Sequence, residues 1–270
     1  MNSDVVFDGS IPEAYDRYLG PLLFEPFAAD LARRLAKLQP RNVLEVAAGT
    51  GIVTRRLLEV LPAKSRLTVT DLNEPMLNHA RHKIGGDPRV DWRQADALEL
   101  PFSPGEFDAV VCQFGLMFFP DKAKGVSEFY RVLAPDGHLL LSVWDSVEAN
   151  PHSTIAQSAI AEFLPVDPPQ FYAIPFSYSD IPEIRKVVTA AGFNDVEIET
   201  IKLTGESPSA ALAARGFVCG NPVVNTIRER APDKLGEIEQ LAAKRLNERY
   251  GPDPIRIPLQ AHVVSAVRPT

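Results

Sequence analysis

The chain has 270 residues, of which 45% are hydrophobic and 23% charged, so it can bury a large core and is neither disordered nor fibrous. Its formal net charge is −7, and because an acidic surface repels phosphate backbones, we expect no nucleic-acid partner. Cys112 and Cys219 are too few for a disulfide framework and lack the spacing of a zinc site, which is typical of a reducing compartment.

The first ten residues, MNSDVVFDGS, carry acids where a signal peptide has basic residues, and they lack an apolar stretch. No uninterrupted apolar run reaches the ~20 residues that cross a bilayer. We therefore expect a cytoplasmic protein with no integral membrane segment.

Helix-like and strand-like segments alternate through the first half of the chain. Apolar residues at helical spacing predict a helix at 26–38, ahead of the first strand. Short β-branched runs predict strands at 43–48, 66–72, 90–96, 107–114 and 138–144, and the segments between them predict helices at 52–61, 74–83 and 122–133. Such an alternation indicates a mostly parallel sheet with helices on both faces.

The pattern changes after residue 145. A helix is predicted at 180–191, a strand at 195–203 and a last strand at 260–268. No crossover helix leads directly into this last strand, so we expect it to run antiparallel to its neighbour. Two further stretches interrupt the scheme, one rich in proline and aromatic residues and one partly helical.

The turn after the first strand reads Glu45-Val-Ala-Ala-Gly49-Thr-Gly51. Glycines allow a sharp turn and the close approach of a ligand, and the helix N-terminus that follows favours an anionic group. The dinucleotide fingerprint G-x-G-x-x-G requires a third glycine, but Thr54 stands there. A glycine turn that serves only helix packing is the alternative.

Two acidic residues end the next two strands. Asp71 can accept two hydrogen bonds from a ribose diol, a feature that NAD-dependent enzymes share. Asp96, together with the backbone N–H of Ala97, can read an adenine edge, the carboxylate accepting from the amino group. A structural helix cap is the alternative interpretation of Asp96.

As a set, these motifs resemble the class I S-adenosylmethionine-dependent methyltransferases, and specifically the small-molecule branch with the ubiquinone/menaquinone C-methyltransferase-like (type 11) enzymes. The resemblance is carried by VLEVAAGTG (43–51), TDLNEPML (70–77), QADALELPF (94–102), FDAVVCQFGLMFFPD (107–121) and RVLAPDGHLLLSVW (131–144), with YDRYLGPLLFEPFA (15–28) similar to the N-terminal segment. Ala47 departs from the family's usual first glycine, a change that relatives tolerate.

The resemblance implies S-adenosyl-L-methionine as cofactor, released as S-adenosyl-L-homocysteine, and it implies a set of cofactor-binding residues. The methionine part would be surrounded by Glu45, Ala47, Gly49, Thr50 and Gly51. The ribose would be held by Asp71, and the adenine by Leu72, Met76, Asp96 and Ala97. Gln113 would offer its backbone carbonyl to the ammonium group, with Phe114 close by. Tyr15 and Tyr18 would close the N-terminal segment over the cofactor, although plain helix packing explains them equally well.

The fold implied is α/β: a Rossmann-like three-layer sandwich with a mostly parallel seven-stranded sheet, an antiparallel last strand and cap insertions. We expect a single methyltransferase domain over 1–270. Its parts are an N-terminal helical segment at 1–40, a cofactor-binding core at 41–145, substrate-cap insertions at 146–179 and 204–258, and segments at 180–203 and 259–270 that complete the sheet.

Methyl transfer from a sulfonium needs no fixed acid–base residues, because placement alone can supply ~7–11 kcal/mol. The catalytic residues are therefore undetermined, and His152, Tyr172 and Asp145 are only weak candidates for a general base. We expect no metal, because His79 and His82 share a helix face without an acidic or cysteine partner. The aromatic residues of the insertions predict a small, partly apolar organic acceptor.

The atom that receives the methyl group, carbon, nitrogen or oxygen, stays open, as does a homodimer. After the fourth strand, Gln113-Phe-Gly-Leu is unlike the Asn-Pro-Pro-Tyr type of sequence, which argues against methylation of an adenine or glutamine amino group. The alternative function is a cofactor-binding protein without turnover that acts as a regulatory or binding subunit. An NAD-dependent oxidoreductase is disfavoured by Thr54 and by the last strand.

Overall fold

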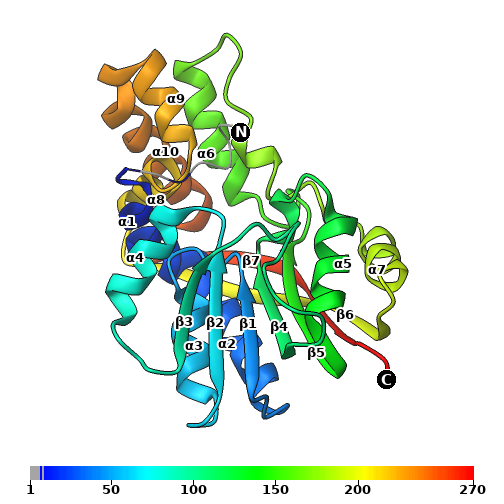
Figure 1. Ribbon diagram of the computed structural model, residues 1–270. Helices are drawn as coiled ribbons and strands as arrows, with labels where there is room; N and C mark the ends of the chain where they lie inside the picture. Colours follow the sequence, from blue (N-terminus) through cyan, green and yellow to red (C-terminus); the bar gives the residue numbers. More distant parts are fainter. Residues whose placement is uncertain (1–6, 8) are drawn as a thin grey trace.

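The computed structural model describes residue 7 and residues 9–270, so most of the stretch that argued against a signal peptide lies outside the described residues. A seven-stranded sheet forms the centre of the molecule, in the order β3-β2-β1-β4-β5-β7-β6 (Figure 1). Its strands are β1 (Asn42–Val46), β2 (Arg66–Asp71), β3 (Val90–Gln94), β4 (Phe107–Gln113), β5 (Leu133–Trp144), β6 (Asn194–Ser207) and β7 (Ile255–Val267).

Neighbouring strands are parallel except where β7 is involved, since β7 runs antiparallel to both β5 and β6. The predicted α/β fold with a mostly parallel sheet and an antiparallel last strand is therefore confirmed. The central strands β1 and β4 are buried along almost their whole length, as expected for strands covered on both faces, whereas the edge strands β3 and β6 are largely polar and exposed.

Strands β6 and β7 are longer than predicted. They pair from Asn194 opposite Val267 to Ser207 opposite Ile255, well beyond the expected limits at Leu203 and Gln260. The sequence concealed this extension because a proline, here Pro258, cannot donate to a ladder and normally marks the end of a strand. Pairing along the edge of the sheet overrides that local signal.

Five helices cover the two faces of the sheet: α2 (Glu25–Ala36), α3 (Ile52–Val60), α4 (Glu74–Ile84), α5 (Lys122–Val132) and α7 (Ile181–Ala190). Helix α2 packs on α3, and α5 packs on α7 on the opposite face (Figure 1). Aspartate side chains begin two of them: Asp121 accepts a hydrogen bond from the Lys124 N–H at 2.8 Å, and Asp180 accepts one from the Glu183 N–H at 2.7 Å.

The remaining helices form a second layer above the carboxyl ends of the parallel strands (Figure 1). They are α1 (Ile11–Ala14), α6 (His152–Phe163), α8 (Ala210–Cys219), α9 (Val223–Arg230) and α10 (Leu235–Tyr250), with short 3₁₀ turns at Leu116–Phe118, Phe171–Ala173 and Pro232–Lys234. Helix α10 packs against both α6 and α8, so segments from the two predicted insertions meet in one layer. We call this layer the helical cap.

A π-helical segment, η2 (Tyr15–Phe24), connects α1 to α2 and packs against α8 of the helical cap. It therefore passes between the sheet's carboxyl edge and the cap, at the position where a ligand would lie. Among the described residues, no helix combines the length and apolarity needed to cross a membrane.

Candidate functional site

The glycine turn between β1 and α3 has a left-handed backbone at three positions, with φ of 56° at Ala47, 57° at Gly49 and 78° at Gly51. The two glycines are needed for different reasons. A Cβ on Gly51 would lie 2.8 Å from Ile84 Cδ1 and 2.9 Å from Ala80 Cβ, so this position allows the turn to pack on α4. A Cβ on Gly49 would meet only the Met76 methyl group, at 3.6 Å, within 4 Å. Packing thus explains Gly51, and Gly49 borders the pocket described below.

Asp71, at the end of β2, is tied to this turn. Its Oδ2 accepts a hydrogen bond from the Gly49 N–H at 2.7 Å, and its Oδ1 accepts one from the Asn73 N–H at 2.7 Å. The side chain is 7% exposed, and burial raises the pKa of its carboxyl. We expected the Gly49 N–H to be open to a ligand, but Asp71 occupies it. Each carboxylate oxygen keeps a second lone pair that can accept from a ligand.

A small polar pocket lies beside the glycine turn. It is lined by Tyr15, Phe24, Glu45, Ala47, Ala48, Gly49, Thr50, Ile52, Val53, Gln113 and Phe114. Within the described part of the chain, no hydrogen bond reaches either carboxylate oxygen of Glu45, the Thr50 hydroxyl or Oε1 of Gln113. Burial raises the pKa of Glu45 to about 8. Buried acceptors without donors are costly, so this pocket fits a ligand that carries a cationic donor such as an ammonium group.

The predicted adenine contacts do not line this polar pocket: Leu72, Asp96 and Ala97 follow β2 and β3, and Met76 lies on α4. Leu72 is 44% exposed, which is unusual for a large apolar side chain, while Met76 and Ala97 are buried. Asp96 is exposed, and its Oδ1 accepts a hydrogen bond from the Leu98 N–H at 2.9 Å. This is the local capping contact that we gave as its alternative interpretation. It leaves the other carboxylate oxygen without a hydrogen bond to a described residue.

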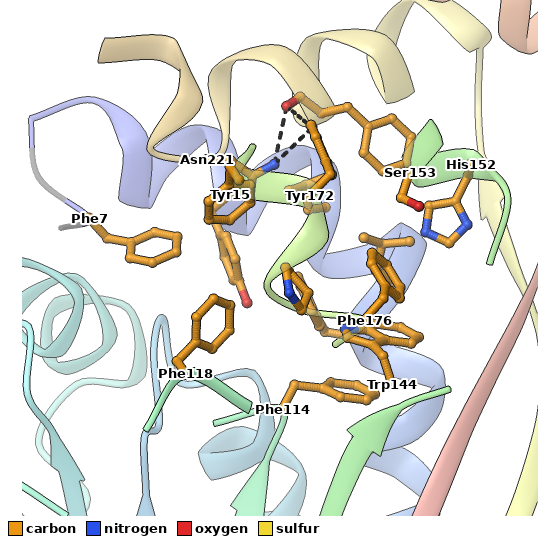
Figure 2. Close-up of a pocket in the computed structure, with 16 residues that line it drawn as sticks. Phe7, Tyr15, Phe114, Phe118, Trp144, His152, Ser153, Tyr172, Phe176 and Asn221 are labelled. Atoms are coloured by element: carbon orange, nitrogen blue, oxygen red, sulfur yellow. Dashed lines mark hydrogen bonds between the residues drawn. The ribbon is translucent and has the colours of Figure 1, made fainter. Parts of the chain in front are cut away.

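A second, mostly apolar pocket adjoins the polar one under the helical cap (Figure 2). Its walls come from the N-terminal segment, the ends of β4 and β5, and both insertions: Phe7, Tyr15, Leu19, Leu23, Phe24, Phe114, Phe118, Trp144, His152, Ser153, Phe171, Tyr172, Pro175, Phe176, Phe217 and Asn221. Tyr15, Phe24 and Phe114 line both pockets. The two pockets are thus neighbours that share a wall of aromatic rings.

Aromatic stacking holds this shared wall. The ring of Phe114 lies flat on Trp144 with centroids 4.0 Å apart and an angle of 3° between the planes. Tyr15 stacks on Phe24 with centroids 4.7 Å apart. Phe24, Trp144 and Asn221 are pocket residues that the sequence reasoning missed. For Trp144 a signal existed, because it ends a parallel strand and such ends meet at the ligand-binding edge of the sheet.

The three candidate bases have different surroundings. His152 and Tyr172 line the apolar pocket, but the Tyr172 hydroxyl donates to the Phe217 carbonyl and accepts from Asn221 Nδ2 at 3.3 Å. Burial raises the pKa of the Tyr172 hydroxyl, so the phenolate that could act as a base is disfavoured. Asp145 lines neither pocket. Nε2 of His262 lies 3.2 Å from its Oδ1, and Gln260 donates a hydrogen bond to its Oδ2.

The two tyrosines predicted to cover the cofactor lie in different surroundings. Tyr15 borders both pockets, whereas Tyr18 lines neither and packs against α8, where a Cβ on Gly216 would lie 2.8 Å from Tyr18 Cβ. A π-helical backbone turns by less per residue than an α-helix, so the face that a side chain occupies in η2 does not follow α-helical spacing. This is why the sequence did not separate them.

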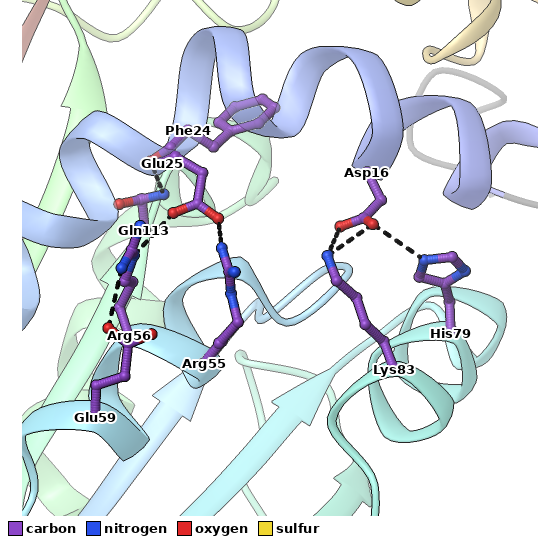
Figure 3. Close-up of polar contacts among 9 residues, drawn as sticks. All are labelled: Asp16, Phe24, Glu25, Arg55, Arg56, Glu59, His79, Lys83 and Gln113. Atoms are coloured by element: carbon purple, nitrogen blue, oxygen red, sulfur yellow. Dashed lines mark hydrogen bonds and ion pairs between the residues drawn. The ribbon is translucent and has the colours of Figure 1, made fainter.

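Ion pairs fasten the N-terminal segment over the polar pocket (Figure 3). Asp16 on η2 pairs with Lys83 at 2.6 Å and lies 3.6 Å from Nε2 of His79, both on α4. Glu25, which begins α2, pairs with Arg55 and with Arg56 of α3, the latter at 2.9 Å. Gln113 also contributes, because its Nε2 donates to the Phe24 carbonyl at 3.3 Å.

His79 thus lies beside the Asp16–Lys83 ion pair, and His82 uses its Nδ1 in a 2.7 Å contact with the Asn78 carbonyl of its own helix. Over residues 7 and 9–270, no three His, Cys, Asp or Glu side chains come together as a metal site would require.

Residues 43–137 match a family described as a methyltransferase domain. The chain is 41% identical over 103 residues to the demethylmenaquinone methyltransferase of Deinococcus radiodurans, a match that covers 38% of this chain and 42% of that protein. It is 27% identical over 180 residues to the demethylmenaquinone methyltransferase of Bacteroides fragilis, covering 62% and 73%. In the first of these matches the chain therefore spans less than half of the relative's length.

Solved structures share the fold. YcgJ of Bacillus subtilis has a TM-score of 0.60 at 18% identity, over 91% of this chain and 99% of that one. Phosphoethanolamine N-methyltransferase 2 of Haemonchus contortus, solved in complex with S-adenosyl-L-methionine, has a TM-score of 0.59 at 20% identity, over 96% and 57%. At these identities the likeness concerns the fold alone.

The fold, the glycine turn with its pocket, and the family match define the class of the molecule. Residues 43–137 match a methyltransferase domain, and the chain has the fold of solved methyltransferase structures.

Proposed function

We propose that this chain transfers the methyl group of S-adenosyl-L-methionine to a small, largely apolar organic acceptor. The observation that carries this proposal is the adjacency of two unlike pockets. One contains buried acceptors that have no hydrogen-bond partner among residues 7 and 9–270, and the other is aromatic and apolar, with Tyr15, Phe24 and Phe114 common to both. A donor in the first and an acceptor in the second would meet at this shared wall.

In this proposal, Glu45 and Gln113 hold the amino-acid part of the cofactor. The Glu45 carboxylate and Oε1 of Gln113 accept no hydrogen bond from a described residue, and the ammonium group has three N–H donors and a positive charge. Ala47, Gly49, Thr50 and Gly51 form the turn that surrounds this part, and the Gln113 backbone carbonyl is a further acceptor at the same place.

Asp71 would then hold the ribose hydroxyls with the lone pairs that the Gly49 and Asn73 N–H groups leave over. The exposed Leu72 and the neighbouring Met76 would cover the adenine once it binds, which would explain why an apolar side chain is 44% exposed without it. Asp96 and the Ala97 N–H would read the adenine edge.

When bound, the cofactor supplies an already activated methyl group. The tasks left to the protein are to align the acceptor with this group and to exclude water, and neither requires a proton-transfer residue. The cap insertions at 146–179 and 204–258 perform both tasks in our proposal, together with η2, because they close the apolar pocket from above.

The relatives' names refer to demethylmenaquinone, an aromatic and apolar molecule, which agrees in character with the aromatic walls of this pocket. This likeness supports an apolar acceptor for this chain without specifying the molecule or the atom that is methylated.

A protein that binds the cofactor without transferring its methyl group is the second candidate. The solved structure of SpnF, named as a cyclase, has a TM-score of 0.59 at 18% identity, over 91% of this chain and 81% of that one. This fold is therefore not restricted to proteins named methyltransferases.

Two measurements on the full chain distinguish these candidates. Calorimetry with S-adenosyl-L-homocysteine tests the cofactor site, and transfer of labelled methyl groups to a panel of apolar phenols, quinols and amines tests turnover. We expect binding together with labelled product from at least one class. Binding with no product from any class would favour the second candidate, and absence of binding would contradict both.

A further inference from the structure

We propose that the apolar pocket excludes cationic molecules, and in the cofactor-free chain anionic molecules as well, and that the His152 imidazole forms the hydrogen bond that selects an acceptor with a hydroxyl or carbonyl group. This inference rests on the proposed function and deepens it. It also gives His152 a role different from the general base that the sequence suggested.

The first step concerns charge. Among the described residues that line the pocket there is no Asp, Glu, Lys or Arg. A charged acceptor would lose its hydration on entry without gaining a counter-charge, and such a loss is far more costly than the burial of a neutral polar group. Without cofactor, the pocket therefore discriminates against anionic and cationic molecules of the same shape, and with the sulfonium of the cofactor bound it still discriminates against cationic ones.

The second step accounts for the polar atoms of the pocket. The Ser153 hydroxyl donates to the Asn150 carbonyl at 2.9 Å. Asn221 Nδ2 donates to the Phe217 carbonyl at 3.1 Å and to the Tyr172 hydroxyl, which itself donates to the same carbonyl (Figure 2). These three side chains already have partners. The Trp144 indole N–H also lines the pocket without a hydrogen bond to a described residue, but it can only donate and so cannot accept from a hydroxyl.

His152 differs from them. Its side chain is 1% exposed, and within the described part of the chain neither ring nitrogen forms a hydrogen bond, with Nδ1 completely buried. A buried imidazole without partners is costly unless a ligand supplies one. The Tyr15 hydroxyl also lacks a hydrogen bond to the described residues, but its ring belongs to the wall shared with the polar pocket, so we assign it to the cofactor side.

The position of the His152 ring is fixed by its neighbours. It stacks on Phe217 with centroids 5.5 Å apart and meets Phe176 edge-on at 6.1 Å. Burial lowers the pKa of His152 to about 3, so the ring is neutral near neutral pH. A neutral imidazole has one donor and one acceptor and can pair with a hydroxyl or a carbonyl, but it is a poor group for accepting a proton.

Four matched probes test this inference: 4-methylphenol, toluene, 4-methylbenzoate and benzylammonium. Trp144 lines the pocket, and the only other tryptophan is Trp92, so fluorescence titration of the full chain in a Trp92→Phe background reports on the pocket. We expect 4-methylphenol to bind about 2- to 10-fold more tightly than toluene, the usual effect of one hydrogen bond, and the two charged probes to bind more weakly than toluene. Charged probes that bind as tightly as toluene would overturn the inference.

Three variants locate the hydrogen bond. His152→Phe should remove the preference for 4-methylphenol and leave toluene binding unchanged, whereas His152→Asn, which keeps a donor and an acceptor, should retain the preference. Tyr15→Phe should also retain it. Loss of the preference in Tyr15→Phe, or its persistence in His152→Phe, would show that His152 is not the partner.

A measurement on the unmodified residue covers the case in which His152→Phe does not fold. In the wild-type chain, a ¹⁵N imidazole signal that is absent from the spectrum of His152→Asn should shift with 4-methylphenol and not with toluene. Equal shifts with both probes would overturn the inference. Cofactor calorimetry and the methyl-transfer assay are scored separately, so a chain that selects 4-methylphenol through His152 but methylates nothing would contradict the proposed function alone.

Discussion

Asp71 at the end of β2 accepts a hydrogen bond from the Gly49 N–H in the turn after β1, with 2.7 Å between Oδ2 and the nitrogen. The proposed ribose contact and the proposed methionine contact are thus joined by one hydrogen bond. A change at either residue should therefore affect both parts of the cofactor site.

Asp71→Ala should weaken the binding of S-adenosyl-L-homocysteine by about 1–3 kcal/mol, because the ribose hydroxyls and the Gly49 N–H both lose an acceptor. Calorimetry measures the effect. Asp91→Ala is the matched control, since Asp91 lies on the neighbouring strand and pairs with Arg93 at 2.7 Å on the surface. Equal affinities of the wild-type chain and Asp71→Ala would remove Asp71 from the cofactor site.

Binding of S-adenosyl-L-homocysteine near pH 7 should release a proton from Glu45. Burial raises its pKa to about 8 in the ligand-free chain, so the carboxyl is largely protonated, and an ammonium group beside it favours ionisation. Affinity should then rise as the pH increases toward 8 and level off above it. Calorimetry in buffers with different ionisation enthalpies counts the proton.

Glu45→Gln is the control for this proton. It retains the size of the side chain and cannot ionise, so its affinity should be lower and should depend less on pH over the same range. Asp71, whose pKa burial also raises, is present in both proteins and is therefore not the source of a difference between them. Equal proton release by the two proteins would contradict the role of Glu45.

Asp16→Asn should weaken cofactor binding by about 0.2–1 kcal/mol at low salt, because it removes the ion pair to Lys83, beside the contact to His79, that holds η2 over the polar pocket (Figure 3). The difference from wild type should shrink as the salt concentration rises. Glu59→Gln is the matched control, since the Arg56–Glu59 pair, 3.0 Å apart, lies within α3 and its loss leaves η2 in place. Equal effects of the two substitutions would show that η2 is not held by Asp16.

Gly51→Ala should mainly reduce the free energy of unfolding, whereas Gly49→Ala should mainly weaken cofactor binding. Both place a side chain on a left-handed backbone, which costs about 1–2 kcal/mol. Gly51→Ala also forces a Cβ against Ile84 and Ala80, so we expect a total loss of about 2–5 kcal/mol in the free energy of unfolding. Urea denaturation of the ligand-free chain measures this loss.

Gly49→Ala should lose only the smaller part of this stability. It should also bind S-adenosyl-L-homocysteine more weakly, because its new Cβ stands beside Met76 on the turn that lines the polar pocket. The stability comparison and the binding comparison are independent. Similar unfolding free energies for the two variants would contradict the assignment of Gly51 to packing against α4.

The sequence by itself determined the sheet, the antiparallel last strand and the glycine turn. These features follow from local sequence patterns, namely β-branched runs, helical spacing of apolar residues, and glycines where the chain must reverse. The positions of the acids after β2 and β3 could be predicted in the same way, because the carboxyl ends of parallel strands meet at one edge, whereas their contacts with the cofactor stay a prediction.

Only the tertiary structure decided the composition of the apolar pocket. His152, Tyr172 and Phe217 come from segments separated by up to 65 positions in the chain, and they meet because α10 packs on both α6 and α8. It also placed Tyr15, but not Tyr18, at the pockets, and it placed Asp145 beside His262, away from both pockets. Local patterns record which face of an element is apolar, but which elements bring those faces together depends on packing over the whole chain.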